Sequence, residues 1–250
     1  MYDLTVVSGA DTTYFKYLSR LINNINKYRD KDSHKHLNIN LVIYDLGLNN
    51  VEVEVIKNKN NIIYEKFNFD LYPEHVSINK YGNGTGIDNN KNRSCNYSCS
   101  YAWKPIIIHQ VCMKYGGLVF WSDTRNIHKG FKDLITIIKN NYIYSPSVGI
   151  KIKKFCHPTT KNLLNADSFL DKNDRSGGIF GVNYNIPWCR DLVTEWKVLS
   201  LIKECIVPDG SNRNNHRQDQ TILSILYWRY QNKYNFTVSD KWIRLTSWND

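Results

Sequence analysis

Short apolar runs along this chain alternate with segments in which apolar residues recur at helical spacing. The runs at 4–7, 39–44, 62–67, 118–121 and 179–182 have the length and composition of strands. The second and fourth are nearly unbroken, as expected for strands that are buried on both faces. Strands that alternate with helices predict an α/β fold with a mostly parallel central sheet flanked by helices.

The helical segments have recognisable starts and stops. Thr12 or Thr13 can cap the first helix, and Pro105 fits the first turn of another, which ends at Gly116. Further helices are predicted over 131–140, 188–202 and about 219–229. Residues 51–57 alternate Val and Glu, which fits an edge strand or a helix, and the pattern leaves the two open.

Two predicted strands end on an acid, Asp45 and Asp123. Ligands of open α/β sheets bind in the crevice beyond the carboxyl ends of the strands, so Asp123 predicts an active-site edge. Its carboxylate could ligate a divalent cation, or it could cap the next turn. The nearest cations are Lys104 and Arg125, and either could hold a diphosphate.

Two further polar clusters are candidates for chemistry. His216-Arg217-Gln218-Asp219-Gln220 stands at the start of a predicted helix. Asp219 could be the helix N-cap, a general base, or both. The other cluster is Asp174-Arg175-Ser176-Gly177-Gly178, whose glycines permit close approach of the backbone to a ligand.

A long segment rich in Asn, Gly and Ser, residues 79–100, has no periodicity. Loops of this length are either functional or disordered, and we expect a mobile lid. Residues 82–86, Gly-Asn-Gly-Thr-Gly, could instead cradle phosphate. A strand before them and a clear helix after them are both missing from the pattern, which makes the lid the better interpretation.

Composition narrows the class of protein. A chain of 250 residues with 42% hydrophobic content fits a single domain with a sizeable core. We recognise neither a signal peptide nor a membrane-spanning run, and six sparse cysteines fit reduced thiols, so we expect a soluble, cytoplasmic protein. The net charge of +10 could attract nucleic acid, but Lys and Arg are scattered along the chain. We therefore expect no nucleic-acid partner.

Several of these motifs form a known series. They are Ser8-Gly9 at the end of the first strand, Asp45, Tyr101-Ala102-Trp103-Lys104, Trp121-Ser122-Asp123-Thr124-Arg125, Gly177-Gly178-Ile179-Phe180-Gly181, and His216 to Gln220. Together they resemble the GT-A class of nucleotide-sugar glycosyltransferases over nearly the whole chain. The Tyr-Ala-x-Lys piece resembles the segment before the Asp-x-Asp strand of glycogenin-like transferases. The chain also looks like a GT-A-like group present in large DNA viruses and some animals.

The resemblance implies a role for each motif. It implies a single domain over 1–250, with a nucleotide-binding half over 1–125 and an acceptor and catalytic half over 126–250. The resemblance places Ser8, Gly9 and Asp45 at the nucleoside, Lys104 at the diphosphate or donor sugar, and Asp123 at the metal or ribose. Gly177 and Gly178 would line the sugar or the acceptor, and Arg125, His216 and Gln220 are further candidates for donor binding. The implied catalytic residues are Asp219, as base or sugar-binding acid, and Asp174.

One motif departs from the family pattern. GT-A enzymes commonly carry Asp-x-Asp, whereas this chain has Asp123-Thr124-Arg125. The resemblance implies Mn²⁺ or Mg²⁺ at Asp123, and the departure leaves two possibilities open. The metal site is completed by another residue, or the enzyme is metal-independent, with Arg125 and Lys104 neutralising the leaving group.

The resemblance implies transfer of a sugar, of the hexosyl or N-acetylhexosaminyl class. The donor would be a nucleotide-diphosphate sugar, with UDP as the expected nucleotide, and the acceptor a hydroxyl on a glycan or protein. A virus-encoded chain would work in the host cytoplasm or the virion. The alternative is a catalytically silent GT-A-like module that binds a nucleotide or a glycan, which the incomplete Asp-x-Asp motif supports.

Overall fold

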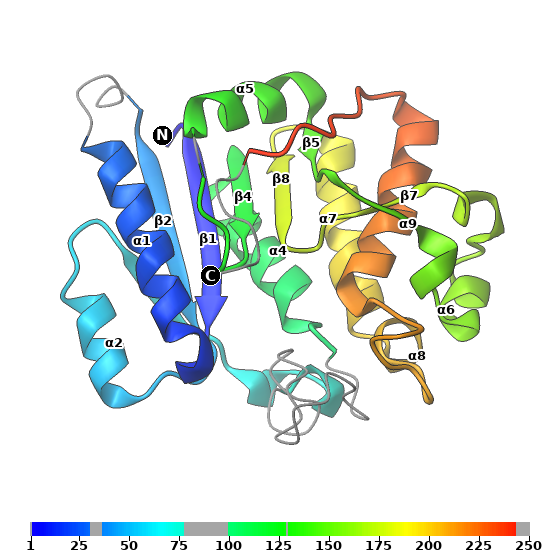
Figure 1. Cartoon of the computed structure of the whole chain (residues 1–250), viewed down its shortest axis with the longest axis horizontal. Coiled ribbons are helices and arrows are strands. Elements are labelled where there is room, and N and C mark those ends of the chain that lie inside the picture. Colours follow the sequence, from blue (N-terminus) through cyan, green and yellow to red (C-terminus); the bar gives the residue numbers. More distant parts are fainter. Residues whose placement is uncertain (1, 31–36, 78–99, 129, 244–250) are drawn as a thin grey trace.

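A six-stranded sheet forms the centre of the molecule, in a computed structural model that describes residues 2–30, 37–77, 100–128 and 130–243 (Figure 1). The strands lie in the order β3-β2-β1-β4-β8-β5. Their bounds are β1 Leu4–Ala10, β2 Ile39–Asp45, β3 Ile63–Lys66, β4 Leu118–Ser122, β5 Ile143–Tyr144 and β8 Ile179–Asn183. Strands β1 to β4 are parallel, and β8 lies antiparallel between β4 and β5. The prediction of an α/β fold with a mostly parallel sheet is confirmed.

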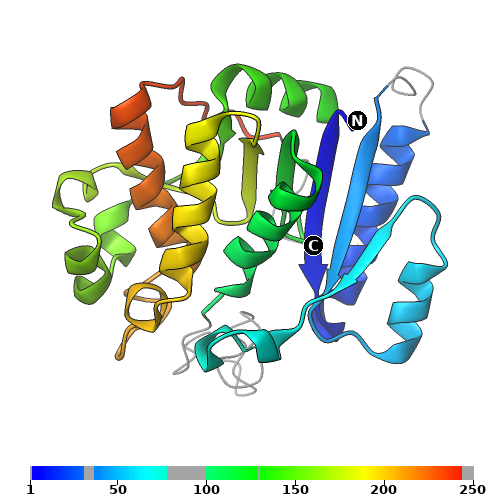
Figure 2. The ribbon, with the colours of Figure 1, turned by 180° about the vertical axis from the view of Figure 1, so that it is seen from behind.

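Helices cover both faces of this sheet, as the opposite views of Figures 1 and 2 show. Helices α1 and α5 cover one face, whereas α4 and α7 cover the other, with α9 packed on α7. The helix bounds are α1 Phe15–Arg29, α2 Asn50–Lys57, α4 Trp103–Tyr115, α5 Phe131–Asn141, α6 Pro158–Leu163, α7 Pro187–Ser200, α8 Lys203–Ile206 and α9 Gln218–Tyr234. Among the described residues, no helix combines the length and apolar character needed to cross a membrane.

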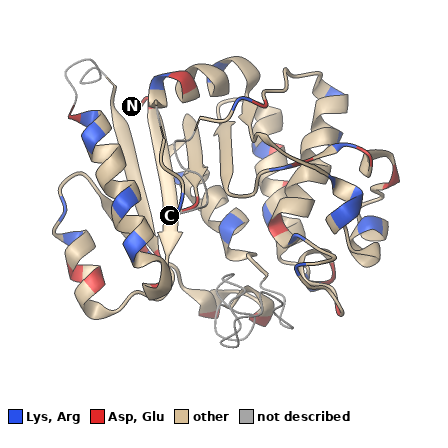
Figure 3. Ribbon diagram, in the orientation of Figure 1, with Lys and Arg blue, Asp and Glu red and all other residues tan. Residues whose placement is uncertain are grey.

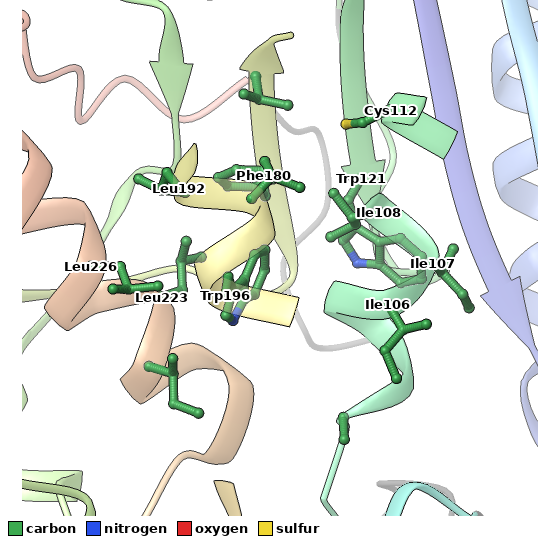
Figure 4. Packing of buried hydrophobic residues seen from close by; sticks show 14 of the residues in the cluster. Ile106, Ile107, Ile108, Cys112, Trp121, Phe180, Leu192, Trp196, Leu223 and Leu226 are labelled. Carbon is green, nitrogen blue, oxygen red and sulfur yellow. The ribbon is translucent and has the colours of Figure 1, made fainter. Parts of the chain in front are cut away.

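The alternation of side chains along the strands builds two cores. Val6 packs in the core beneath α1 and α5, whereas its neighbour Val7 packs in the core beneath α4 and α7. Figure 4 shows the second core, where Trp121 of β4 and Phe180 of β8 meet helix side chains such as Ile107 and Leu192. Both faces of β4 are therefore buried, which fixes the position of its carboxyl end.

Three local predictions are decided by capping interactions. Residues 51–57 belong to helix α2, because the Asn49 side chain and Glu52 form a capping box at its start. The first helical turn is capped by Asp11, which accepts a hydrogen bond from the Tyr14 backbone N–H, so the prediction of a cap at Thr12 or Thr13 is wrong. Asp219 is not the N-cap of α9 either, since the helix begins at Gln218 and Asp219 lies in its first turn.

Several short elements were not predicted. A second sheet pairs β6 (Ser147–Lys151) with β7 (Asn173–Arg175), and α6 and α8 are additional short helices. Single 3₁₀ turns lie at Thr12–Tyr14, Phe69–Leu71, Glu74–Val76, Ile152–Phe155 and Asp167–Phe169. The predicted lid at 79–100 lies, except for Ser100, outside the described residues, together with Cys95 and Cys99. The cysteines that are described form no disulfide.

The order of the strands creates a switch point in the sheet. The chain proceeds from β1 outward to β2 and β3, and then returns to place β4 on the other side of β1. In open α/β sheets, ligands bind where the strand order reverses, beyond the carboxyl ends. Here that edge is flanked by Asp11 after β1 and Asp123 after β4, and β8 starts beside it because Ile179 pairs with Ser122.

Candidate active site

A buried lysine joins the polar clusters at this edge. Lys104 stands in the first turn of α4 and is only 3% exposed. Its Nζ lies 3.3 Å from Asp123 Oδ1, 3.1 Å from Asp219 Oδ2 and 3.1 Å from the carbonyl oxygen of Gly177. The contact with Gly177 is a hydrogen bond, and the contacts with the two carboxylates are ion pairs. The structure therefore brings together four predicted site residues that are far apart in the sequence.

Asp123 is the member of this group that faces solvent. Its side chain is 42% exposed, and its Oδ1 also accepts a hydrogen bond of 2.7 Å from the Trp121 indole N–H. Residues two apart in a strand point the same way, which places Trp121 beneath the carboxylate. The backbone N–H of Asp123 donates to the carbonyl of Gly178 at 2.9 Å, so β8 continues to hold the chain just beyond the end of β4.

Asp219 is the buried acid of the group, at 4% exposure. Burial raises the pKa of Asp219 to about 6; the Lys104 charge opposes this shift and the Asp123 charge adds to it. At neutral pH the carboxylate is therefore mostly ionised, yet it can accept a proton within the physiological range. The Trp196 indole N–H donates a hydrogen bond of 3.1 Å to the backbone carbonyl of Asp219.

Two glycines allow both carboxylates to reach the backbone before β8. A Cβ at Gly178 would lie 2.8 Å from Asp123 Oδ2, and a Cβ at Gly177 would lie 3.1 Å from Asp219 Oδ2. Any larger residue at either position would have to displace an acid or be displaced by it. Neither glycine has a positive φ, so close approach, and not backbone freedom, accounts for glycine here.

Asp174 lies behind this group, at 1% exposure. Its Oδ1 accepts a hydrogen bond from Ser224 and its Oδ2 accepts one from the Gln220 amide, both at 2.5 Å. The carbonyl of the same amide accepts the backbone N–H of Gly177 at 3.3 Å. Burial raises the pKa of Asp174 to about 6, although these hydrogen bonds lower it. Asp174 therefore contacts the site through Gln220, which it orients.

Two arginines lie in the neighbourhood of Asp123, each beside an aromatic ring. The guanidinium of Arg125 lies 4.7 Å from the ring centre of Tyr17 and 5.4 Å from that of Tyr14. Arg213 donates a hydrogen bond of 3.1 Å to the Tyr101 hydroxyl, whose ring also lies 5.1 Å from Lys104 Nζ. Burial raises the pKa of Tyr14, and the charges of Arg125, Asp11, Asp123 and Arg213 also act on it, so these groups surround one edge of the sheet.

The backbone is unusual at the two helix starts that carry Lys104 and Asp219. Tyr101, which precedes α4, has φ of 49°, and Gln218, the first residue of α9, has φ of 41°. Residues other than glycine seldom adopt this left-handed conformation, which costs on the order of 1–3 kcal/mol. Such residues persist where the surrounding structure holds them and gather at functional sites.

The remaining predicted site residues lie elsewhere along the edge or away from it. The Ser8 hydroxyl donates to the Ser122 carbonyl at 2.7 Å, and Gly9 packs against Leu46, so both tie strands together. Asp45 accepts the backbone N–H groups of residues 47 and 48 and the hydroxyl of Tyr64, which makes it a turn former.

His216 is not directed at the lysine-centred group. It is fully buried, with Nε2 3.1 Å from the Ile206 carbonyl oxygen and Nδ1 accepting the backbone N–H of His157. Burial lowers the pKa of His216 to about 4, so it is neutral at physiological pH. Its contacts hold the loop before α9, and its predicted contact with a donor stays a prediction.

The described residues fit a divalent metal poorly. Among them, no group of three His, Cys, Asp or Glu side chains is placed to hold one ion. The Oδ1 atom of Asp123 already accepts a hydrogen bond from the Trp121 indole N–H and forms an ion pair with Lys104. The residue two positions further on, where Asp-x-Asp has its second acid, is Arg125. A metal at Asp123 would need further oxygen ligands, which these residues do not provide.

The residues that sequence reasoning missed are aromatic and cationic. Trp121 could have been found, because a residue two before Asp123 in a strand must share its face. Tyr14 and Tyr17 lie at the start of the first helix, where an aromatic residue gives no local signal of a site. Arg213 lies in a loop without periodicity, and only the fold brings it to the site.

Comparison with known proteins shows the fold. No protein-family model matches the chain, and no curated protein is significantly similar to it in sequence. Among solved structures, it is similar to the galactosyltransferase LgtC in complex with donor and acceptor sugar analogues, at 16% identity and a TM-score of 0.50, over 89% of this chain and 70% of that one. It is also similar to core-mannan synthase A from Aspergillus fumigatus, in its Mn/GDP form, at 9% identity and a TM-score of 0.55, over 90% and 69% of the two chains. The molecule thus has the fold of GT-A glycosyltransferases.

Proposed function

We propose that this protein is a glycosyltransferase that moves a sugar from a nucleotide-diphosphate sugar to a hydroxyl on a glycan or protein. The observation that carries the proposal is the meeting of Lys104, Asp123 and Asp219 at the switch point of a GT-A fold. UDP is the nucleotide we propose, with a hexose or an N-acetylhexosamine as the sugar. The division into a donor half at 1–125 and an acceptor half at 126–250 belongs to the same proposal, as does a cytoplasmic location.

The reaction requires one bond to break and another to form. The bond between the anomeric carbon and the diphosphate breaks, the acceptor oxygen bonds to that carbon, and the acceptor hydroxyl loses its proton. The solvent-facing Asp123 binds the ribose, while Asp219 accepts a hydrogen bond or the proton from a sugar or acceptor hydroxyl. Both roles of Asp219 need an ionised carboxylate, and Gln220 holds the backbone of Gly177 beside it.

A screen of nucleotide sugars for release of the nucleoside diphosphate tests this proposal. We expect kcat/KM for the active donor to rise with pH through about 6, because the pKa of Asp219 is raised to about 6 and the ionised form is the active one. Asp219→Asn should lower the rate by about 10²–10⁴-fold. The matched control is Asp171→Asn, an exposed acid paired with Lys153, which should leave the rate unchanged.

A silent binding module is the second candidate. It is favoured by the incomplete Asp-x-Asp motif and by the three protein acceptors that already engage Lys104. Calorimetry separates the candidates: a module would bind a nucleotide sugar without releasing its diphosphate. A protein that binds no nucleotide sugar would contradict both.

A further inference from the structure

On the basis of the proposed function, we propose that the chain neutralises the donor diphosphate with its own cations, Arg125 and Arg213, and needs no divalent metal. In this proposal Asp123 anchors the Lys104 ammonium at the place where a metal would otherwise bind. Lys104 then acts as a fixed positive charge between two carboxylates, and the two arginines contact the phosphates.

The groups that contact the Asp123 carboxylate are the first observation that supports this proposal. Its Oδ1 receives the Trp121 N–H at 2.7 Å and faces Lys104 Nζ at 3.3 Å, so this oxygen is already occupied by two donors. A divalent ion bound to the same carboxylate would face the ammonium at close range, and like charges repel. Arg125 adds a cation where a second carboxylate would have supplied a ligand.

The contacts of the Lys104 ammonium group are the second observation. Its Nζ donates a hydrogen bond to the Gly177 carbonyl and forms ion pairs with Asp123 and Asp219. The lysine is therefore buried and held in place by protein groups, and we assign the contact with the phosphates to other cations. That task falls to Arg125, which is exposed, and to Arg213, which is half-buried.

The arginine supports are the third observation. Arg125 lies over the rings of Tyr17 and Tyr14, and Arg213 is held by the hydroxyl of Tyr101. These aromatic residues hold both guanidiniums in place, and a guanidinium can bind a phosphate through a bidentate contact. Two guanidiniums supply the same charge of +2 as one divalent cation.

Calorimetric titration of the full chain with UDP and with GDP tests the inference. We expect the Kd of the nucleotide that binds to be the same in excess EDTA as with Mn²⁺. Arg125→Gln and Arg213→Gln should each weaken its binding by about 10- to 100-fold, since each removes a hydrogen bond to a charged group. Binding of the corresponding nucleoside, which has no phosphate, should not change.

Two more variants sharpen the test. Arg190→Gln removes the same charge from an exposed position on α7, and should leave the Kd unchanged. Arg125→Asp restores the Asp-x-Asp spacing, so in EDTA it should bind at least as weakly as Arg125→Gln. Binding of this variant at the wild-type level in EDTA would overturn the assignment of Arg125.

The outcomes separate this inference from the proposed function. If EDTA abolishes binding to the wild type and Mn²⁺ restores it, the inference fails and the proposed function stands. If metal-free binding persists and neither arginine variant weakens it, the cation assignment is wrong. If neither nucleotide binds with or without metal, the proposed function itself fails.

Discussion

At the scale of single residues, Lys104 shows how the site balances its charges. Burial lowers the pKa of a lysine, but Asp123 and Asp219 raise that of Lys104 by more, so its pKa is raised overall and it stays charged. The same ammonium lowers the pKa of Asp219, against the effect of burial. Removing one partner of such a buried pair leaves the other charge without compensation.

We therefore predict that Lys104→Met lowers the free energy of unfolding at pH 8 by about 3–5 kcal/mol. Loss of the ammonium raises the pKa of Asp219 above its present value of about 6. A raised carboxyl pKa gives stability that is fully present below the unfolded value of about 3.9 and is lost as the pH rises through the folded value. The variant should thus recover part of its loss at pH 5, as measured by urea unfolding at the two pH values.

Lys114→Met provides the matched control. Lys114 pairs with Glu65 at 2.5 Å, but its side chain is 57% exposed, and exposed pairs contribute at most about 1 kcal/mol. Equal losses in the two variants, or a loss for Lys104→Met that does not depend on pH, would contradict the role of Lys104 as a buried counter-charge.

At the scale of elements, the site depends on how closely the ends of β4 and β8 approach. The strands pair antiparallel as far as Ser122 and Ile179, and the chain beyond them remains joined by the hydrogen bond from Asp123 to Gly178. A Cβ at position 178 would lie 2.8 Å from Asp123 Oδ2, a contact that real Cβ atoms essentially never make. The orientation of Asp123 thus depends on a glycine in the neighbouring strand connection.

We predict that Gly178→Ala displaces the Asp123 carboxylate. Overpacking should lower the free energy of unfolding by about 1–3 kcal/mol, and misplacement of a substrate-binding group by about 1 Å can lower activity by about 10²-fold. Denaturant unfolding and the donor-release assay measure the two effects. Gly130→Ala is the control for activity, because a Cβ there meets nothing within 4 Å. Gly130 is the N-cap of α5, where glycine is preferred to alanine, so this variant should lose up to about 1 kcal/mol of stability and keep wild-type activity. Wild-type activity in Gly178→Ala would show that Asp123 has room to adjust.

The sequence could predict those elements whose pattern is local. The apolar runs of β1, β2 and β4 and the periodic face of α1 follow from burial in the two cores, and each was predicted. Strand β7 was missed because its residues, Asn173 to Arg175, are polar. Asp174 and Arg175 are nevertheless buried, and Asp174 has its partner Ser224 on α9, fifty positions away, which leaves no local signal.

The candidate site was predictable in its parts and not in its assembly. Asp123 follows an apolar strand, and Lys104 and Asp219 lie at helix starts, which are local signals. Their meeting depends on β8 running antiparallel to β4 and on α9 packing against α7, which only the fold defines. Asp45 also follows a strand, yet it forms a turn, so a strand-terminal acid alone does not identify a site.

At the scale of the whole molecule, the site brings together residues from the two halves of the chain. Lys104 and Asp123 come from the first half of the chain and Asp219 from the second, while the cores on both faces of the sheet hold the elements in place. Figure 3 shows the Lys, Arg, Asp and Glu residues of the described part of the chain spread over several helices and loops. A ligand at this edge would therefore contact residues from both halves and stabilise the fold as a unit.

We predict that a bound nucleoside diphosphate raises the Tm of the entire protein in one transition. A ligand at 100 times its Kd stabilises the native state by about 2.7 kcal/mol, which corresponds to about 5–10 °C for a chain of this size. Differential scanning calorimetry with UDP or GDP in EDTA measures the shift, and the nucleoside alone should shift the Tm far less. In Arg125→Gln the shift should shrink, because weaker binding leaves the site less occupied at the same ligand concentration. A shift of equal size with nucleoside and diphosphate would mean that the phosphates make no net contribution, and a shift confined to part of the transition would mean that the two halves unfold separately.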